Sequence, residues 1–285
     1  MHKLVLLMPL ELALITGKLM GRLAYLFLPV YSRRAKEHLK AAFEKERSVT
    51  QINKIAKHVF QNLGMSIAEI FCLRRMKRRL AKRIYGQGFE KIDAALKNGK
   101  GAIILSAHFG NWELLPLYFI PNGYPSNVIA RRVYYEKYDV WMELLRKNTG
   151  VNVIYRDESP RKILDVLKKN ELLGIMPDQD IDSVEGVFVN FFGKPTYTPT
   201  APVALAMKVG CPMLPCFIIR EGKRHRIVVE DAVDIQVTDN KENDIAQNTQ
   251  RWTTLLESYI RRYPEQWVWL HKRWKTRPEK IVDSR

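Results

Sequence analysis

The sequence predicts a single α/β domain with a largely parallel central sheet covered by helices, preceded by an N-terminal helix that anchors it to a membrane. Short apolar runs alternate with segments of helical periodicity, which is typical of a parallel sheet buried on both faces. The chain also shows no internal repeat, low-complexity tract or flexible linker. Its 285 residues, 46% hydrophobic and 27% charged, fit one globular domain and exclude a disordered or fibrous protein. We therefore expect an anchor over residues 1–32 and an α/β domain over residues 33–285.

The elements of the α/β domain are expected in a regular order. Thr50 is a suitable N-cap for the second of the helices. Apolar spacing indicates helices over 34–45, 50–73, 90–97, 137–148, 161–169, 200–209 and 242–262, and one more that begins near Asn111. Apolar runs indicate strands over 102–106, 127–130, 151–155, 172–176, 213–219 and 226–229, with a further short run over 187–191.

The N-terminal segment over residues 4–30 is almost free of charge. Its only charged residues, Glu11, Lys18 and Arg22, fall on one narrow stripe of a helix. Because charge interrupts the apolar run, the segment lacks the order of a cleaved signal peptide. Three interpretations stay open: a helix that spans the membrane, a helix that lies in the interface with the stripe toward the headgroups, and a buried helix of a soluble core. The basic residues at 33–36 place the following domain on the cytoplasmic side.

The chain is strongly basic. Lys and Arg number 47 against 30 Asp and Glu, a formal net charge of +17, which favours an anionic partner. Residues 72–83 hold seven basic residues and no acidic one, so this run is either a solvated helix face or a surface for anionic lipid or an acidic protein. It lacks the interleaved aromatic residues of a nucleic-acid site, and we expect no nucleic-acid partner.

The cysteines indicate a reducing compartment. Cys72, Cys211 and Cys216 are too few for a disulfide framework in a chain of this length, and their spacings match no zinc site. We expect neither a metal nor an organic cofactor.

The candidate catalytic residues follow the strand over 102–106. His108 is expected at the carboxyl edge of the sheet, where open α/β sheets place reactive groups, and Glu113 follows at the opening of a helix. A neutral imidazole can take a proton from a hydroxyl, and we expect Glu113 to bond the other ring nitrogen and stabilise the imidazolium. Backbone N–H groups at the start of that helix suit a developing oxyanion. By itself a His-x4-Glu pair is weak evidence, because such pairs also arise by chance.

Longer motifs associate this pair with a family. His108-Phe-Gly-Asn-Trp-Glu113 resembles the first motif of the bacterial lipid A biosynthesis acyltransferases, the lauroyl and myristoyl transferases, within the wider His-x4-Asp/Glu glycerolipid acyltransferases. Departures from the family pattern at Arg132, Tyr135 and Asn190 predict different substrate contacts near Tyr135. The remaining blocks that resemble the family follow in the same order: Val128-Ile-Ala-Arg131 with Asp139, Arg146 with Gly150, Pro177-Asp-Gln-Asp180, Gly186-Val-Phe-Val-Asn-Phe-Phe-Gly-Lys-Pro195 with Thr198 and Ala206, and Trp269-Leu-His-Lys-Arg-Trp-Lys275.

The resemblance implies a membrane-associated O-acyltransferase of the cell inner membrane. It would move a fatty acyl group from acyl carrier protein, or from acyl-CoA, to a hydroxyl of a lipid A precursor on the cytoplasmic side. The acidic carrier protein, the anionic glycolipid and the inner-membrane surface would all suit the basic chain. The resemblance implies His108 as general base, Glu113 as its partner and Arg131 at the oxyanion or an acceptor phosphate. It implies a substrate-binding set that also includes Asp178, Gln179, Asp180, Phe191, Phe192 and Gly193.

Other functions stay open on the residues alone. Related chains of the same family acylate other glycolipids, including mannosylated phosphatidylinositols. A metal-dependent hydrolase that uses His108, Asp178 and Asp180 is a second class of function, and a non-catalytic membrane adaptor is a third. Asp178 and Asp180 are also suited to capping a helix. Structural roles are expected for the remaining histidines considered, namely His38, His58, His225 and His271.

Overall fold

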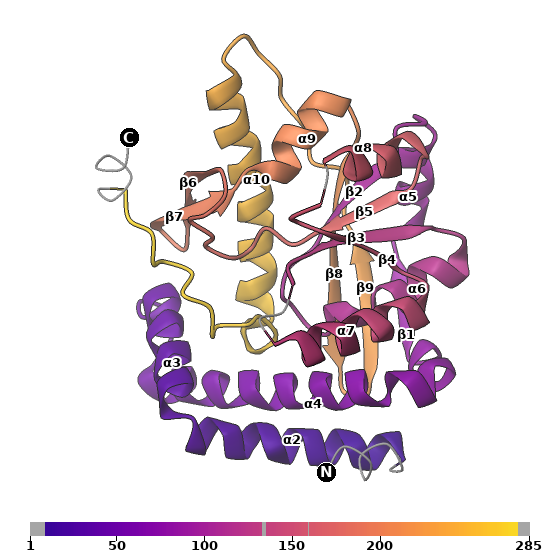
Figure 1. Cartoon of the computed structure of the whole chain (residues 1–285). Coiled ribbons are helices and arrows are strands. Elements are labelled where there is room, and N and C mark those ends of the chain that lie inside the picture. The colour runs from indigo at the N-terminus through magenta and orange to yellow at the C-terminus, as the bar shows by residue number, and fades with distance from the viewer. Residues whose placement is uncertain (1–8, 133–134, 159, 279–285) are drawn as a thin grey trace.

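The computed structural model describes residues 9–132, 135–158 and 160–278, and it confirms the predicted α/β class (Figure 1). The helices at the N-terminal end are α2 (Leu10–Phe27), α3 (Pro29–Phe43) and α4 (Val49–Ala81). The alternating part then runs through β1 (Ile84–Gln87), α5 (Phe89–Leu96), β2 (Ala102–Leu105), η1 (Trp112–Leu114), α6 (Pro116–Phe119), η2 (Ile120–Asn122), β3 (Ser126–Ala130), α7 (Glu136–Thr149), β4 (Asn152–Tyr155), α8 (Pro160–Lys168) and β5 (Leu172–Ile175). The last part comprises β6 (Gly186–Phe191), β7 (Lys194–Pro199), α9 (Ala201–Val209), β8 (Met213–Glu221), β9 (Arg224–Val229), α10 (Lys241–Arg262) and η3 (Pro264–Gln266).

The main sheet has the strand order β1-β9-β8-β2-β5-β3-β4 and is mostly parallel, as predicted. Only the neighbours β8 and β9 run antiparallel among the described strands of this sheet. The central strand β2 is buried on both faces: Ile103 and Leu105 pack in the cluster that holds α9 and α10, and Ile104 packs in the cluster that holds α5 and α6. Because β2, β5 and β3 are parallel, the segments that follow them meet at one edge of the sheet.

The predicted continuous helix over residues 4–30 is broken. Residues 4–8 lie outside the described part, and the helix that begins at Leu10 ends at Phe27, where the chain turns by 91° into α3. Pro29 explains the break, because proline disfavours helical backbone at the residue before it, and Leu28 has φ −115° and ψ 68°. In the part of the chain that the structure describes, no individual helix has the length and apolar character of a membrane span, although the bent pair α2–α3 meets that test jointly.

Helix α2 lies along α4, which crosses below the ends of β8 and β9 (Figure 1). Glycines allow the two helices to approach closely: a Cβ at Gly64 would stand 2.1 Å from the carbonyl oxygen of Gly17, and one at Gly21 would stand 2.1 Å from that of Phe60. An ion pair between Glu11 and Arg83 joins the far ends of the two helices. The helix therefore packs against α4 through one face.

Further elements differ from the sequence prediction, among them α4, which continues to Ala81 instead of ending at residue 73. β1 and β7 were not expected, and the helix expected near Asn111 is replaced by the short elements η1 and α6. β7 pairs with β6 in a separate hairpin, whose turn places Phe192 and Gly193 at φ 53° and 71°. A two-residue hairpin turn favours positive φ, but this conformation strains a phenylalanine. Phe192 is held there by its N–H, which donates to Glu257 at 2.6 Å.

Candidate active site

His108 lies just beyond the end of β2, and Asp178 lies just beyond the end of the adjacent strand β5. The imidazole Nδ1–H donates to Oδ1 of Asp178 at 2.8 Å, and the backbone N–H of His108 donates to Oδ2 at 3.0 Å. The Asp178 side chain is fully buried, whereas that of His108 remains 19% exposed. An imidazole whose Nδ1–H is bound in this way presents the lone pair of Nε2, which can accept a proton.

The charges of this pair stabilise each other. Burial of the His108 ring disfavours its charged form, but the adjacent Asp178 carboxylate outweighs that effect and holds the pKa of His108 above its ordinary value. Burial also opposes ionisation of Asp178, yet His108 and the indole of Trp267 hold the pKa of its carboxyl well below the usual range. The Trp267 Nε1–H donates to Oδ2 at 2.9 Å. Asp178 is therefore a carboxylate that orients and stabilises a protonated His108.

The structure gives Glu113 a partner other than the one expected. Its carboxylate receives two hydrogen bonds from Arg146 of α7, at 2.5 and 3.1 Å, while the Nδ1–H of His108 is bound to Asp178. The expected hydrogen bond from the His108 ring to the Glu113 carboxylate is thus wrong. The helix assumed to carry Glu113 is a short 3-10 turn, and it directs the carboxylate toward α7. The charge of Glu113 also raises the pKa of His108, although less than Asp178 does; burial acts in the opposite direction and lowers it.

Gln179 connects His108 to the C-terminal segment. Its amide Nε2 lies 3.1 Å from Nε2 of His108 and 2.9 Å from Nε2 of His271. The two imidazole centroids are 5.1 Å apart, and Trp112 lies at 4.9 Å from His108 on its other flank. Burial and the charge of His108 lower the pKa of His271 to about 4, so that ring is neutral at physiological pH. His271 belongs to this cluster, a position that its sequence motif alone did not reveal.

The C-terminal segment over residues 267–276, called the C-terminal strap below, contacts the site at several points. Trp267 forms a bridge with Phe109, and the N–H of Val268 donates to the carbonyl of His108 at 3.1 Å. Asp180 accepts hydrogen bonds from the backbone N–H and the hydroxyl of Thr276, at 2.8 and 2.6 Å. Asp180 therefore fixes the C-terminal strap in place through its two hydrogen bonds with Thr276.

In the Phe-Phe-Gly turn, the two phenylalanines are buried and the glycine is exposed. Phe191 is fully buried against Trp267 and Trp274, and Phe192 packs on Phe43 and Trp269. Gly193 forms the exposed tip of the hairpin. The two phenylalanines thus support the C-terminal strap, which contacts Asp178.

Arg131 and Arg132 follow β3 at the same edge of the sheet. Arg131 is exposed, whereas Arg132 bonds Asp157 at 3.2 Å and lies over the ring of Tyr155 at 3.9 Å. The sequence alone does not show which of the two arginines is available to a substrate. The structure distinguishes them, because Arg132 is bound within the protein.

A buried ionic cluster lies next to the loop that follows His108. Glu69 of α4 receives two hydrogen bonds from Arg220 at 2.7 and 3.0 Å, one from His225 at 2.9 Å and one from Asn111 at 2.8 Å. These partners hold the pKa of Glu69 at about 2 against the cost of burial. Ser66, one turn earlier on α4, donates to the carbonyl of Gly110. The loop after His108 is therefore fixed to α4, the helix on which α2 packs.

Two backbone N–H groups that directly follow His108 bond within the protein. That of Phe109 donates to Ala107 and that of Gly110 to Gln266; both lie before the start of the expected helix, where the oxyanion site stays a prediction. Gly110 has φ 60°, and a Cβ there would stand 1.9 Å from the carbonyl oxygen of Ile218. Only glycine fits this close approach to β8.

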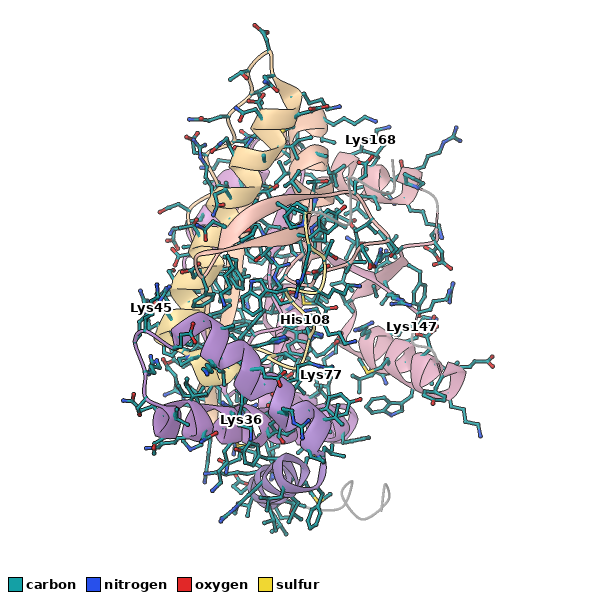
Figure 2. All side chains as sticks on the ribbon, turned by 90° about the vertical axis from the view of Figure 1, so that its left-hand side faces the viewer. Lys36, Lys45, Lys77, His108, Lys147 and Lys168 are labelled. Atoms are coloured by element: carbon teal, nitrogen blue, oxygen red, sulfur yellow. The ribbon has the colours of Figure 1, made fainter. Side chains whose placement is uncertain are left out.

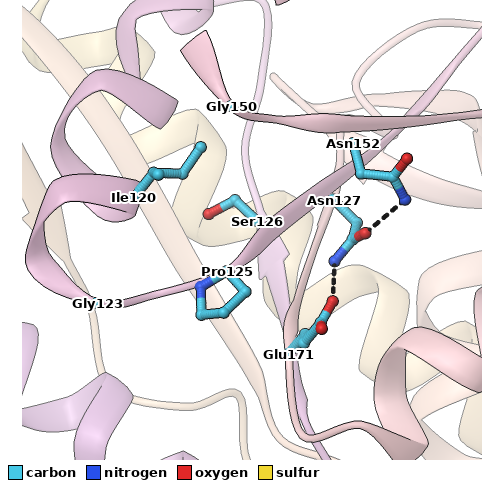
Figure 3. A pocket seen from close by; sticks show the side chains of 8 residues that line it. All are labelled: Ile120, Gly123, Pro125, Ser126, Asn127, Gly150, Asn152 and Glu171. Atoms are coloured by element: carbon cyan, nitrogen blue, oxygen red, sulfur yellow. Dashed lines mark hydrogen bonds between the residues drawn. The ribbon is translucent and has the colours of Figure 1, made fainter. Parts of the chain in front are cut away.

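A pocket among the described residues lies away from His108. It has a volume of about 310 Å³ and is lined by residues at the amino ends of β3 and β4 and just before β5 (Figure 3). A ladder from Asn152 through Asn127 to Glu171 lines one side. His108 follows the opposite end of the parallel strands, so this pocket is separate from the candidate active site. The metal-dependent hydrolase alternative requires several ligands that converge on one metal ion. Among the described residues, no group of three or more His, Cys, Asp or Glu is placed to hold one.

Comparison with known proteins agrees with the motifs. The sequence model of the bacterial lipid A biosynthesis acyltransferases matches residues 1–276. The chain is 29% identical over 223 residues to a phosphatidylinositol mannoside acyltransferase of Mycobacterium tuberculosis (strain CDC 1551 / Oshkosh), covering 75% of this chain and 68% of the relative. It is 25% identical over 267 residues to a lipid A biosynthesis palmitoleoyltransferase of Escherichia coli, covering 92% and 84%. It is also 25% identical over 248 residues to a lipid A biosynthesis myristoyltransferase of that species, covering 86% and 75%. The resemblance seen in the motifs is thus confirmed, and the chain belongs to the bacterial lipid A biosynthesis acyltransferase family.

Proposed function

We propose that this protein transfers a fatty acyl group from a thioester to a hydroxyl of a membrane glycolipid, with His108 as general base. The His108–Asp178 pair is the observation that carries this proposal. The acceptor hydroxyl gives its proton to Nε2 of His108 as its oxygen attacks the thioester carbonyl. Asp178 stabilises the imidazolium that forms, and the carbon–sulfur bond of the tetrahedral intermediate then breaks. The proton on His108 passes to the departing thiolate, so the ring returns to its starting state.

Arg131 is the proposed cationic residue of the substrate site. It follows β3 at the same edge as His108, is exposed, and carries a permanent charge that suits a phosphate or the developing oxyanion. A lipid A precursor with its phosphates matches such a residue, and so does the phosphodiester of a mannosylated phosphatidylinositol.

The exposed face of α2 supports an association with the membrane interface. Leu12, Ile15, Leu19, Leu23 and Leu26 are between 38% and 65% exposed, and they lie opposite the face that packs on α4. Large apolar side chains in this arrangement are typical of a helix that lies in the plane of the headgroups. Each one that leaves water contributes about 1.5–3 kcal/mol. The interfacial interpretation is therefore the one we propose, with the cytoplasmic side of the inner membrane as its location.

The basic surface supports an acidic donor such as acyl carrier protein. Figure 2 shows His108 near the centre of one face, with Lys36, Lys45, Lys77, Lys147 and Lys168 around it in that view. A carrier protein that delivers its thioester to His108 would approach this face, and its acidic surface would be attracted by these charges. Coenzyme A, with its phosphates, is the alternative donor.

The acceptor and the donor can be identified together. The purified full-length chain is incubated with myristoyl thioesters of acyl carrier protein and of coenzyme A, each with a bis-phosphorylated lipid A precursor or a mannosylated phosphatidylinositol in vesicles. Mass spectrometry of the lipids is expected to show one acyl group added to one of the acceptors. The phosphatidylinositol mannoside is retained as a candidate because a relative that is 29% identical carries that name. Absence of an acylated product from every combination would contradict the proposal.

A further inference from the structure

The Asp178 carboxylate receives hydrogen bonds from two distant parts of the chain. Its Oδ1 accepts from Nδ1–H of His108 at 2.8 Å, and its Oδ2 accepts from the backbone N–H of His108 at 3.0 Å. The same Oδ2 also accepts from Nε1–H of Trp267 at 2.9 Å. The Asp178 side chain is fully buried, and Trp267 is 1% exposed. The imidazole and the indole therefore share the charge of one carboxylate that water does not reach.

The C-terminal strap holds the indole in this position. Trp267 forms a β-bridge with Phe109, and the N–H of Val268 donates to the carbonyl of His108 at 3.1 Å. The ring of Trp267 also packs edge-on against that of Trp269, with the centroids 4.7 Å apart. Because the strap is bonded to the backbone of His108 and of the next residue, the indole keeps its place relative to the His108–Asp178 pair.

Other charged groups also act on this pair. They come from three elements: Glu113 of η1, Arg146 of α7, and His271 and Arg273 of the C-terminal strap. Glu113 favours the charged form of His108, and Arg146, which is bonded to Glu113, opposes it. Burial disfavours the charged ring, and Asp178 outweighs that burial. Protonation of His108 therefore depends more on the Asp178 carboxylate than on any other charge in this set.

A strong carboxylate partner has a disadvantage for a general base. The imidazole must be neutral before the acceptor hydroxyl arrives, because only the neutral ring accepts a proton. A nearby negative charge favours the protonated ring, and a hydrogen bond that stabilises this negative charge weakens its effect on the ring. The indole N–H of Trp267 is such a bond. It therefore acts on His108 through Asp178, and in the direction opposite to that of the carboxylate.

We propose that Trp267 is a positioning residue that limits the basicity of His108 through its hydrogen bond to Asp178. The inference rests on the acyltransferase function proposed above, in which His108 is the base. By sharing the charge of Asp178, the indole lets the carboxylate orient the imidazole and stabilise the imidazolium during attack, without keeping the ring protonated beforehand. Trp267 does this through Asp178, the residue to which its N–H is bonded.

Titration of His108 in Trp267→Phe tests this role without any acyl transfer. The chain has six histidines, and NMR of the protein with labelled histidines follows each imidazole, while His108→Ala identifies the signal of His108. The variant keeps an aromatic ring but loses the N–H. The pKa of His108 is expected to rise by about 0.5, a fraction of the effect of a hydrogen bond to a charged group. The acidic limb of the kcat/KM profile should move to higher pH with it, opposite to the direction expected for Asp178→Asn.

Trp269→Phe is the matched control. Trp269 is also buried in the C-terminal strap, and its Nε1–H donates to the carbonyl of Pro264 at 2.6 Å. This variant therefore loses the same ring volume and one hydrogen bond, but not the bond to Asp178, and should leave the pKa of His108 unchanged. If Trp267→Phe does not fold, 3-benzothienylalanine at position 267 serves instead, because sulfur replaces the N–H in a ring of the same shape. It should produce the same rise.

The outcomes separate this inference from the proposed function. An unchanged or lowered pKa of His108 in the variants at position 267 would overturn the inference, and so would an equal rise in Trp269→Phe. Neither result would affect the proposed function, because the titration requires no turnover. Absence of acyl transfer by the native protein would instead contradict the proposed function, whatever the titration shows.

Discussion

The Nδ1 atom of His108 lies 2.8 Å from Oδ1 of Asp178, so residues 70 positions apart form the hydrogen-bonded pair at the centre of the site. The parallel pairing of β2 with β5 produces this contact, because it brings the segments after both strands to the same edge. The carboxylate of Glu113, five residues after His108 in the chain, accepts hydrogen bonds from Arg146 instead.

Asp178→Asn and Glu113→Gln are expected to have different effects. The first removes the carboxylate that stabilises the imidazolium, and acyl transfer should fall about 10²–10⁴-fold with little change in KM. The second weakens the pair with Arg146 and is expected to lower the free energy of unfolding by about 2 kcal/mol, because a half-buried cation loses its partner. Steady-state kinetics and urea unfolding of both variants check this assignment. Equal losses of kcat in two stably folded variants would contradict it.

The activity of the native protein should fall as the pH is lowered through the raised pKa of His108. Burial disfavours the charged ring, but Asp178 outweighs it, so the ring is protonated at a higher pH than an ordinary histidine. Since the base must be neutral, the acidic limb of the kcat/KM profile should lie above pH 6.5. Asp178→Asn should move the limb of its residual activity to lower pH. A limb that stays in place in that variant would show that another group titrates.

The raised pKa of His108 affects stability and activity in opposite directions as the pH changes. A raised pKa means that the folded state binds this proton more tightly than the unfolded chain. The stabilisation from the His108–Asp178 pair is therefore fully present below about pH 6.5 and is lost as the pH rises through the folded pKa. Activity and this part of the stability should thus change in opposite directions over that pH window.

Removal of Glu69 should destabilise the protein strongly. Glu69→Ala leaves the buried Arg220 without its carboxylate, which typically costs about 3–5 kcal/mol. Chemical denaturation measures this loss. A double variant, Glu69→Leu with Arg220→Met, removes both charges and should recover much of the stability. No recovery in the double variant would indicate that the cluster acts through more than the balance of its charges.

The exposed face of α2 should determine binding to vesicles. Replacement of Ile15 and Leu19 by serine removes two exposed apolar side chains and is expected to weaken binding to anionic vesicles at least about 10-fold. Val237→Ser is a matched control, because Val237 is 66% exposed and lies in the segment that precedes α10 rather than on α2. Co-sedimentation checks both. Unchanged binding by the double variant would exclude this face as the site of contact.

Much of the fold was predictable because apolar runs mark buried strands directly. β2 and β5 begin at the predicted residues and end one residue early, and the α10 prediction is one residue short at its start. β7 escaped prediction because its sequence, Lys-Pro-Thr-Tyr-Thr-Pro, lacks an apolar run and forms a strand only by pairing with β6. The break at Leu28 was signalled by Pro29, but the apolar run on both sides concealed it.

The site was less predictable than the fold. His108 was identified from its place after a strong strand, but its partner was sought five residues further along the chain. The tertiary pairing of β2 with β5 determines the partner instead. Trp267 and His271 lie about ninety residues beyond Asp178 and reach the site only because the C-terminal strap returns over it. His271 lies in the block that resembled the family signature and Trp267 lies two residues before that block, yet nothing local indicated which of these side chains reach the site.

The most direct test of this account is the rate of acyl transfer by His108→Ala, compared with the native protein and with His58→Ala, a histidine on α4 outside the site. We expect that His108→Ala folds, still binds vesicles and loses nearly all transfer, whereas His58→Ala retains it. If His108→Ala kept more than about a tenth of the native rate, less would be lost than a general base normally contributes, and His108 would not be the base.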